Sequence, residues 1–116
     1  MTPRYWSMMI VLSLTLGLSY ASGHAASGDP AKGKAIYEKL CLACHGPQGK
    51  GDGPTGKVIK PPAVDFTSAR SKKKPPTVLL KVIEEGRANT AMVAWTRQLS
   101  DEEIQHVLAY VIALRN

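Results

Sequence analysis

The strongest helical pattern lies at the C-terminus of the chain. From Ile104 to Leu114, apolar residues recur every three or four positions, which places them on one face of a helix. Ser100, followed three residues later by Glu103, forms a capping box at the predicted start of this helix. Arg115 at the far end suits the negative pole of the helix dipole. The apolar face consists of Ile104, Val107, Leu108, Val111 and Leu114.

A second helix is predicted over residues 31–40. Asp29 is a good N-cap, and Pro30 occupies the first helical position, where its missing N–H costs nothing. Gly33 costs about 1 kcal/mol relative to alanine inside a helix. Either a close helix–helix crossing offsets this cost, or glycine is tolerated because it lies near the helix start. The apolar face consists of Ile36, Tyr37 and Leu40.

A third, shorter helix is predicted from about Thr77 to Glu85, and Gly86 is its natural end. No segment has the pattern of a strand, and no internal repeat is visible. The fold class is therefore predicted to be all-α. The buried stripe of the third helix consists of Leu79, Val82 and Ile83.

Residues 1–25 have the pattern of a secretory signal peptide. Arg4 lies near the start, an apolar run covers residues 8–18, and small residues follow. Even when extended to Tyr20, the run falls short of the roughly 20 residues that span a bilayer. An uncleaved membrane anchor is the alternative.

Cleavage between Gly23 and Ala26 would leave residues 26–116 as one small domain, exported to the periplasm. The chain of 116 residues has a formal net charge of +6, of which the signal segment carries only Arg4. A basic surface suits nucleic acid, anionic lipid or an acidic protein. Because export argues against nucleic acid, an acidic protein partner fits best.

The candidate chemistry lies in Cys41-Leu42-Ala43-Cys44-His45. C-x-x-C-H is the attachment signature of c-type haem, in which two thiols bond to the haem and the histidine binds the iron. In a helix, residues three apart share a face, so both sulfurs can reach one porphyrin. A disulfide would close a very small loop, a thioredoxin-like pair needs a βαβ unit, and structural zinc needs four ligands. The motif therefore predicts one haem c, bound through Cys41 and Cys44.

Two irregular segments are predicted to lie beside this haem. Residues 46–54 contain four glycines and two prolines, so the backbone of this loop can pass close to the ring. Residues 60–66 are expected to pack apolar groups against the haem edge. The basic run of residues 70–74 is either a solvated turn or a docking patch.

Haem iron has two axial positions, of which His45 fills one. His106 points away from the apolar face of the last helix, so we expect it to face water. Met92 can be a core filler, but it lies in a loop between the two later helices and is the only methionine after residue 25. We predict Met92 as the second ligand, because a thioether–imidazole pair is an established haem ligation. The candidates set aside with the signal segment and its cleavage zone are Met1, Met8, Met9 and His24.

Trp95 lies in the same loop, three residues after Met92. Its indole N–H could donate a hydrogen bond to a haem propionate, or its ring could simply pack at the haem edge. The residues alone leave both interpretations open.

With these residues placed, the chain resembles a small class I cytochrome c of the bacterial periplasmic type. The matching segments are Gly33-x-x-x-Tyr37, residues 41–46, Gly51-Asp52-Gly53-Pro54, Pro61-Pro62-x-x-Asp65-Phe66, the Met92 loop, and residues 99–104 with Tyr110. The resemblance implies three to four helices around one covalently bound haem. It also implies that the first and last helices cross at right angles, with Gly33 facing the Tyr110 region. A loop prolyl carbonyl, that of Pro54, is implied to accept the Nδ1 proton of His45. One departure is Val93, since family members often have proline after the ligand methionine.

The resemblance implies an electron-transfer protein rather than an enzyme, working in a periplasmic respiratory chain. Basic residues would steer acidic redox partners, such as a dehydrogenase, an oxidase or a reductase, to the haem edge. We expect a monomer that contacts a membrane only if the signal segment is retained. The alternatives are a haem sensor or a peroxidase-like enzyme with an open or displaceable sixth site, and a subunit of a larger respiratory complex. The steering residues are Lys57, Lys60, Lys72, Lys73 and Lys74.

Overall fold

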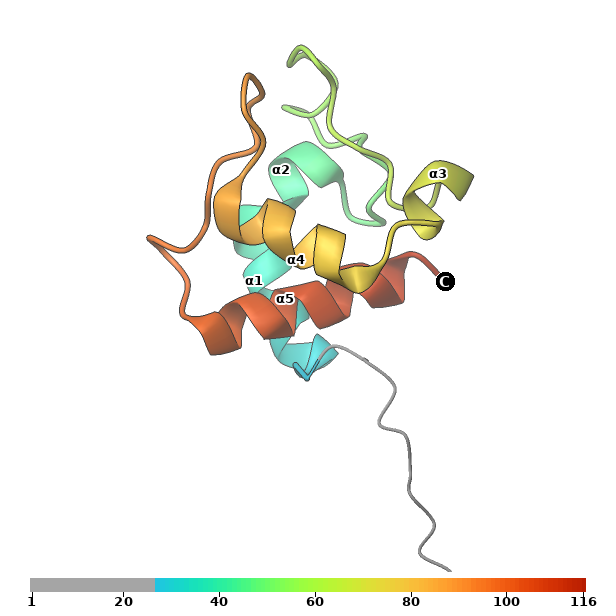
Figure 1. Cartoon of the computed structure of the whole chain (residues 1–116). Coiled ribbons are helices and arrows are strands. Elements are labelled where there is room, and N and C mark those ends of the chain that lie inside the picture. The colour runs from blue at the N-terminus through green and yellow to red at the C-terminus, as the bar shows by residue number, and fades with distance from the viewer. Residues whose placement is uncertain (1–26) are drawn as a thin grey trace, which may run out of the picture.

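The computed structural model describes residues 27–116 (Figure 1). Within this range the chain is all-α, as predicted, with five helices and no strand. No helix in this range is long and apolar enough to cross a membrane. The predicted signal segment and its cleavage site lie outside the described residues. The helices are α1 (Pro30–Leu40), α2 (Leu42–His45), α3 (Ala69–Lys72), α4 (Pro76–Glu85) and α5 (Asp101–Leu114).

The terminal helices α1 and α5 cross, and α4 packs beside α5 (Figure 1). The start of α1 forms as predicted, since the Asp29 carboxylate accepts a 2.8 Å hydrogen bond from the Ala31 N–H. At the crossing, a Cβ on Gly33 would lie 1.9 Å from the carbonyl oxygen of His106. The close approach of the two backbones, rather than simple tolerance, therefore explains this glycine.

Tyr110 lies one turn beyond the backbone that Gly33 contacts. Its ring meets the ring of Tyr37 edge-on, with centroids 5.1 Å apart and planes at 63°. Edge-to-face pairs of this kind are favourable beyond the area that they bury. Gly33 therefore contacts α5 at His106, and Tyr110, one turn further along α5, contacts Tyr37 of α1.

His106 does not face water, contrary to prediction. Its side chain is only 12% exposed, and its Nδ1 accepts a 2.8 Å hydrogen bond from the Asp29 N–H. Its Nε2 lies 3.4 Å from the Glu102 carboxylate. The prediction considered only the apolar face of α5, whereas the start of α1 covers a second face. His106 is nevertheless no candidate ligand, because it does not line the cavity described below.

The start of α5 follows the predicted capping box. The Ser100 hydroxyl accepts from the Glu103 N–H at 3.2 Å, and the Ser100 N–H donates to the Glu103 carboxylate at 2.8 Å. At the other end, Arg115 is buried, and its guanidinium donates to the carbonyl oxygens of Ser71 and Lys74. Arg115 therefore fastens the end of the chain to α3. The core residues from α5 are Ile104, Val107, Leu108 and Val111.

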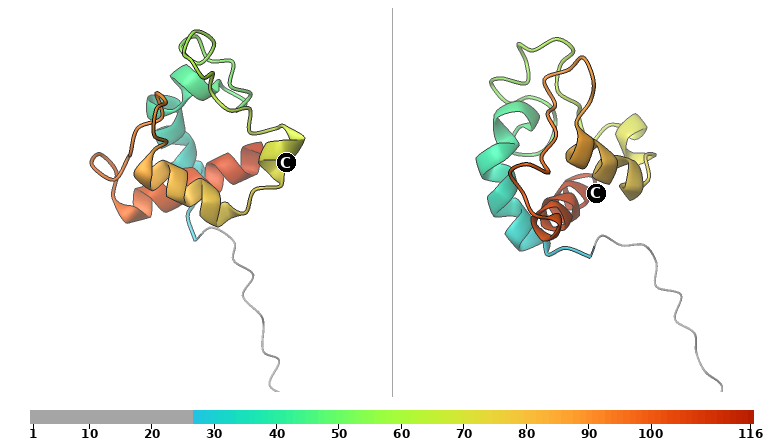
Figure 2. Two further views of the ribbon diagram at one scale, coloured as in Figure 1. Left: turned by 45° about the horizontal axis from the view of Figure 1, so that its top comes forward. Right: turned by 60° about the vertical axis from the view of Figure 1, so that its left-hand side comes forward.

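Two long loops, residues 46–68 and 86–100, extend to the same end of the molecule (Figures 1 and 2). The first loop follows α2, and the second joins α4 to α5. Both loops contribute side chains to one cavity, which they share with α1, α2, α4 and α5.

Candidate haem site

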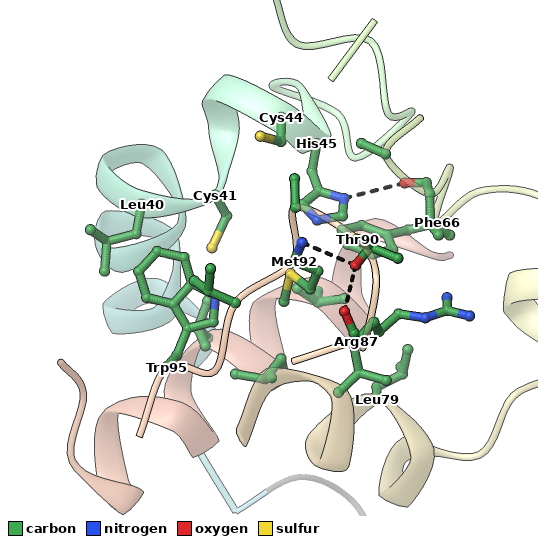
Figure 3. Close-up of a pocket in the computed structure, with 18 of the residues that line it drawn as sticks. Leu40, Cys41, Cys44, His45, Phe66, Leu79, Arg87, Thr90, Met92 and Trp95 are labelled. Carbon is green, nitrogen blue, oxygen red and sulfur yellow. Dashed lines mark hydrogen bonds between the residues drawn. The ribbon is translucent and has the colours of Figure 1, made fainter. Parts of the chain in front are cut away.

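The cavity has a volume of about 280 Å³ and is lined mainly by apolar side chains. Cys41, Cys44, His45 and Met92 all line it (Figure 3). The first three belong to the α2 segment, and Met92 comes from the loop between α4 and α5. The structure therefore brings the four predicted site residues to one cavity, although about 50 positions separate the two segments.

Both cysteines are free thiols at the start and within the turn of α2. The N–H of His45 donates to the Cys41 carbonyl at 2.9 Å, so the C-x-x-C-H segment is helical as its spacing requires. Burial, and next the neighbouring Cys44, raise the pKa of Cys41 to about 11. Burial therefore disfavours a charged sulfur at Cys41, which suits an uncharged thioether.

His45 lies between a carbonyl group and an aromatic ring. Its Nδ1 is 3.3 Å from the carbonyl oxygen of Val64, which accepts the Nδ1 proton, and its ring stacks on Phe66 at 4.5 Å and 17°. Burial lowers the pKa of His45, and the hydrogen bond to Val64 acts in the opposite direction. A neutral imidazole with its Nδ1 proton engaged presents Nε2 as a metal ligand.

The acceptor at Nδ1 is not Pro54, which the resemblance implied. The chain around Pro54 instead packs on the carbonyl groups of α2, where the Thr55 N–H donates to Ala43 at 2.9 Å. The glycines of this region also contact the α2 backbone: a Cβ on Gly56 would lie 1.8 Å from the Cys44 carbonyl oxygen. None of residues 46–54 lines the cavity, so the expectation that this loop passes beside the ring is wrong.

The segment of residues 60–66 does contribute apolar groups to the cavity, as predicted. Sequence reasoning missed the two contacts that His45 makes with it. Phe66 is the only phenylalanine in the chain, and it follows a Pro-Pro pair that ends regular structure. These two features were the signals in the sequence that could have pointed to a contact with His45. The lining residues of the segment are Pro61, Pro62, Ala63, Val64 and Phe66.

Trp95 supplies a test of whether haem fits. Its Nε1 is buried and has no hydrogen-bond partner among the described residues, and its ring lines the cavity near Leu40 and Cys41 (Figure 3). Buried indole N–H groups usually have an acceptor, and a haem propionate is one. Two thiols and an imidazole are the groups that attach and ligate haem c, and a thioether is one of its established second ligands. The residues present therefore fit haem c.

A family model described as cytochrome c oxidase, cbb3-type, subunit III matches residues 28–111. The chain belongs to this family of cytochrome c domains. Membership implies a covalently bound haem c and electron transfer, and it confirms the resemblance to class I cytochromes c. From sequence, residues 41–45 indicated the haem, and segments from Gly33 to Tyr110 carried the resemblance to the class I cytochromes c.

Among curated relatives, cytochrome c-554(547) of Halothiobacillus neapolitanus is 31% identical over 96 residues, covering 77% of this chain and the whole relative. The cbb3-type oxidase subunit CcoP of Azospirillum brasilense is 34% identical over 102 residues, covering 87% of this chain. This cytochrome spans only about a third of the length of the CcoP relatives that it matches.

Solved structures share the fold. A chain of the Kuenenia stuttgartiensis reducing HAO-like protein complex has a TM-score of 0.65 and 31% identity, over 84% of this cytochrome and 47% of that chain. The KustC0563 c-type cytochrome has a TM-score of 0.60 at 24% identity, over 72% of this cytochrome and 98% of that chain. The second match supports the fold alone.

Proposed function

We propose that this cytochrome is a monohaem carrier that transfers single electrons between redox proteins in the periplasm. In this proposal Cys41 and Cys44 attach the haem, and His45 and Met92 are its axial ligands. The observation that carries the proposal is the convergence of these four side chains on one cavity (Figure 3). The haem would supply an iron that alternates between the ferric and ferrous states.

The surrounding residues hold both proposed ligands in place, so little would have to move when the charge of the iron changes. His45 is fixed by the Val64 carbonyl and by the Phe66 ring. Met92 comes from a different loop, so separate parts of the chain would hold the two iron ligands. A site closed on both sides favours electron exchange over the binding of a substrate.

The mouth of the cavity supports a protein partner. Val64, Val78 and Val93 line the cavity and are exposed, which gives the mouth an apolar rim. Apolar contact patches with charged surroundings are typical of transient protein interfaces. The names of the CcoP relatives, which are oxidase subunits, support a redox protein as the partner.

Basic residues flank this rim, and an acidic partner would complement them. Lys57 and Lys60 are exposed and lie within two positions of the cavity-lining Ile59 in the sequence, and Lys74 lines the cavity itself. Within residues 27–116 these lysines take part in neither of the lysine–carboxylate ion pairs, which join Lys34 to Glu38 and Lys81 to Glu85. Unpaired charges steer association and make its rate salt-dependent.

The proposal is tested on the exported holoprotein by rapid mixing with an acidic one-electron carrier protein. We expect the bimolecular rate to fall steeply with ionic strength, and to fall at low salt when Lys57 and Lys60 are both changed to glutamate. The double change Lys32→Glu and Lys39→Glu is the matched control, because it alters the net charge equally and both exposed lysines lie on α1 outside the cavity. Ready binding of carbon monoxide to the reduced wild-type protein at neutral pH would instead favour a sensor or peroxidase-like site.

A further inference from the structure

A hydroxyl group lies inside the turn that presents Met92 to the cavity. The Arg87 N–H donates a 2.9 Å hydrogen bond to the Met92 carbonyl oxygen. The Met92 N–H and the Arg87 carbonyl are joined indirectly, through the Thr90 side chain. Its Oγ1 accepts from the Met92 N–H at 3.2 Å and donates to the Arg87 carbonyl at 2.8 Å (Figure 3). The Thr90 hydroxyl therefore takes the place of a direct hydrogen bond from the Met92 N–H to the Arg87 carbonyl.

The bridge uses the only proton of the hydroxyl and one of its two acceptor lone pairs. Its single proton goes to the Arg87 carbonyl, so it cannot also be donated to a group inside the cavity. One of its acceptor lone pairs takes the proton of the Met92 N–H. Although Thr90 lines the cavity, its polar atom thus acts on the backbone of Met92 and not on a bound group.

The bridge matters because the other restraints act on the carbonyl side of Met92, which accepts from the Arg87 N–H and packs against Gly86, and not on its N–H. Asn89 turns the chain with a φ of 60°, a conformation that non-glycine residues adopt infrequently. Val93, directly after Met92, is 51% exposed and adds little packing. The next backbone anchor is the 3.0 Å hydrogen bond from the Trp95 N–H to the Ile83 carbonyl, three residues beyond Met92.

We propose that Thr90 is a positioning residue, whose hydroxyl bridge between Arg87 and Met92 keeps the Met92 thioether directed at the haem iron. This inference rests on the proposed ligand role of Met92. Loss of the bridge leaves the Met92 N–H without its partner and raises the population of the state in which the thioether has left the iron. Thr90 thereby sets how readily an external ligand can take the sixth position.

The test measures carbon monoxide affinity of the reduced holoprotein in Thr90→Val and Thr90→Ser. Carbon monoxide binds only the open state, so its apparent affinity follows the open population. Valine keeps the shape and removes the hydroxyl, and with it both hydrogen bonds of the bridge, so we expect carbon monoxide to bind at least about tenfold more tightly. Serine keeps the hydroxyl, and we expect binding close to that of the wild type.

Two further variants show whether the Thr90 hydroxyl itself restrains Met92. Thr96→Val is the matched control, because the Thr96 hydroxyl donates to the Glu84 carbonyl at 3.3 Å in the same loop without contacting Met92. The role of Thr90 is overturned if carbon monoxide affinity rises equally in Thr96→Val and Thr90→Val. It is also overturned if Thr90→Val binds carbon monoxide with wild-type affinity. Met92→Ala should bind carbon monoxide far more tightly than the wild type. If it does not, the proposed closed site fails, whereas tight binding in Met92→Ala with an unchanged Thr90→Val rejects the positioning role alone.

Discussion

The hydroxyl of Tyr37 donates a 2.6 Å hydrogen bond to the carbonyl oxygen of Gly46, the residue that follows His45. Tyr37 is fully buried, and its ring packs edge-on against Tyr110 of α5. Burial is the main cause that raises the pKa of Tyr37 above its usual range, so the phenol stays a neutral donor. One side chain therefore connects the crossing of α1 and α5 to the end of the C-x-x-C-H helix.

Replacing Tyr37 with phenylalanine should destabilise the protein by about 1–3 kcal/mol, because the Gly46 carbonyl then loses its buried partner. Chemical denaturation of the holoprotein measures this change. Tyr110→Phe is the control, since it preserves the ring pair and the bond from Tyr37 to Gly46. If Tyr110→Phe lowers the free energy of unfolding as much as Tyr37→Phe does, the hydrogen bond to Gly46 is not the cause.

Gly33→Ala should weaken the packing of the terminal helices. The new methyl group would overlap the His106 carbonyl oxygen, so α1 and α5 must separate. Overpacking of this kind costs about 1–3 kcal/mol, which exceeds the gain of about 1 kcal/mol in helix propensity. Thermal unfolding is the measurement, with Lys32→Ala on the exposed side of α1 as the control. A Gly33→Ala protein as stable as the wild type would contradict the close crossing.

Asp65 should make stability depend on pH in the acid range. The hydroxyl and the N–H of Thr67 donate to its carboxylate at 2.7 and 2.8 Å, and these bonds, the hydroxyl first, hold the pKa of Asp65 below its usual value. The resulting stabilisation is complete above about pH 4, the ordinary carboxyl pKa, and is lost as the pH falls through the lowered folded-state pKa.

Urea denaturation of wild type and Asp65→Asn between pH 7 and pH 2 tests this account. We expect the wild type to be the more stable protein at neutral pH, and the difference to shrink below about pH 4. A difference that stays constant over the whole range would show that the charge of Asp65 is not responsible.

Trp95→Phe should lower the reduction potential. If the indole N–H donates to a haem propionate, its loss leaves the propionate charge less compensated and favours the ferric state. A change of about 1 kcal/mol corresponds to roughly 40 mV for one electron, which a redox titration resolves. A potential equal to that of the wild type would mean that Trp95 only packs at the haem edge.

The sequence predicted the elements whose signals are local. Asp29, Ser100 and Glu103 cap their helices as expected, because each cap involves only neighbouring residues. The C-x-x-C-H spacing identified the site for the same reason. His106 was misjudged because its environment depends on the start of α1, about 75 positions away. The Val64 contact with His45 depends in the same way on how a loop returns to α2.

Thr90 shows a different limit. A threonine two residues before a loop methionine has no special pattern, and its bridge becomes visible only when the loop geometry is known. Arg115 is similar, since its position at the end of α5 suggested an interaction with the dipole. Its buried hydrogen bonds to Ser71 and Lys74 depend on the packing of α3.

The central claim is that Met92 completes a closed iron site opposite His45. The most direct measurement is the optical spectrum of the ferric holoprotein in wild type and in Met92→Ala. We predict a weak charge-transfer band of methionine-ligated haem iron near the red end of the wild-type spectrum, and its absence in Met92→Ala. A band that is missing from the wild type, or that survives unchanged in Met92→Ala, would contradict this ligation.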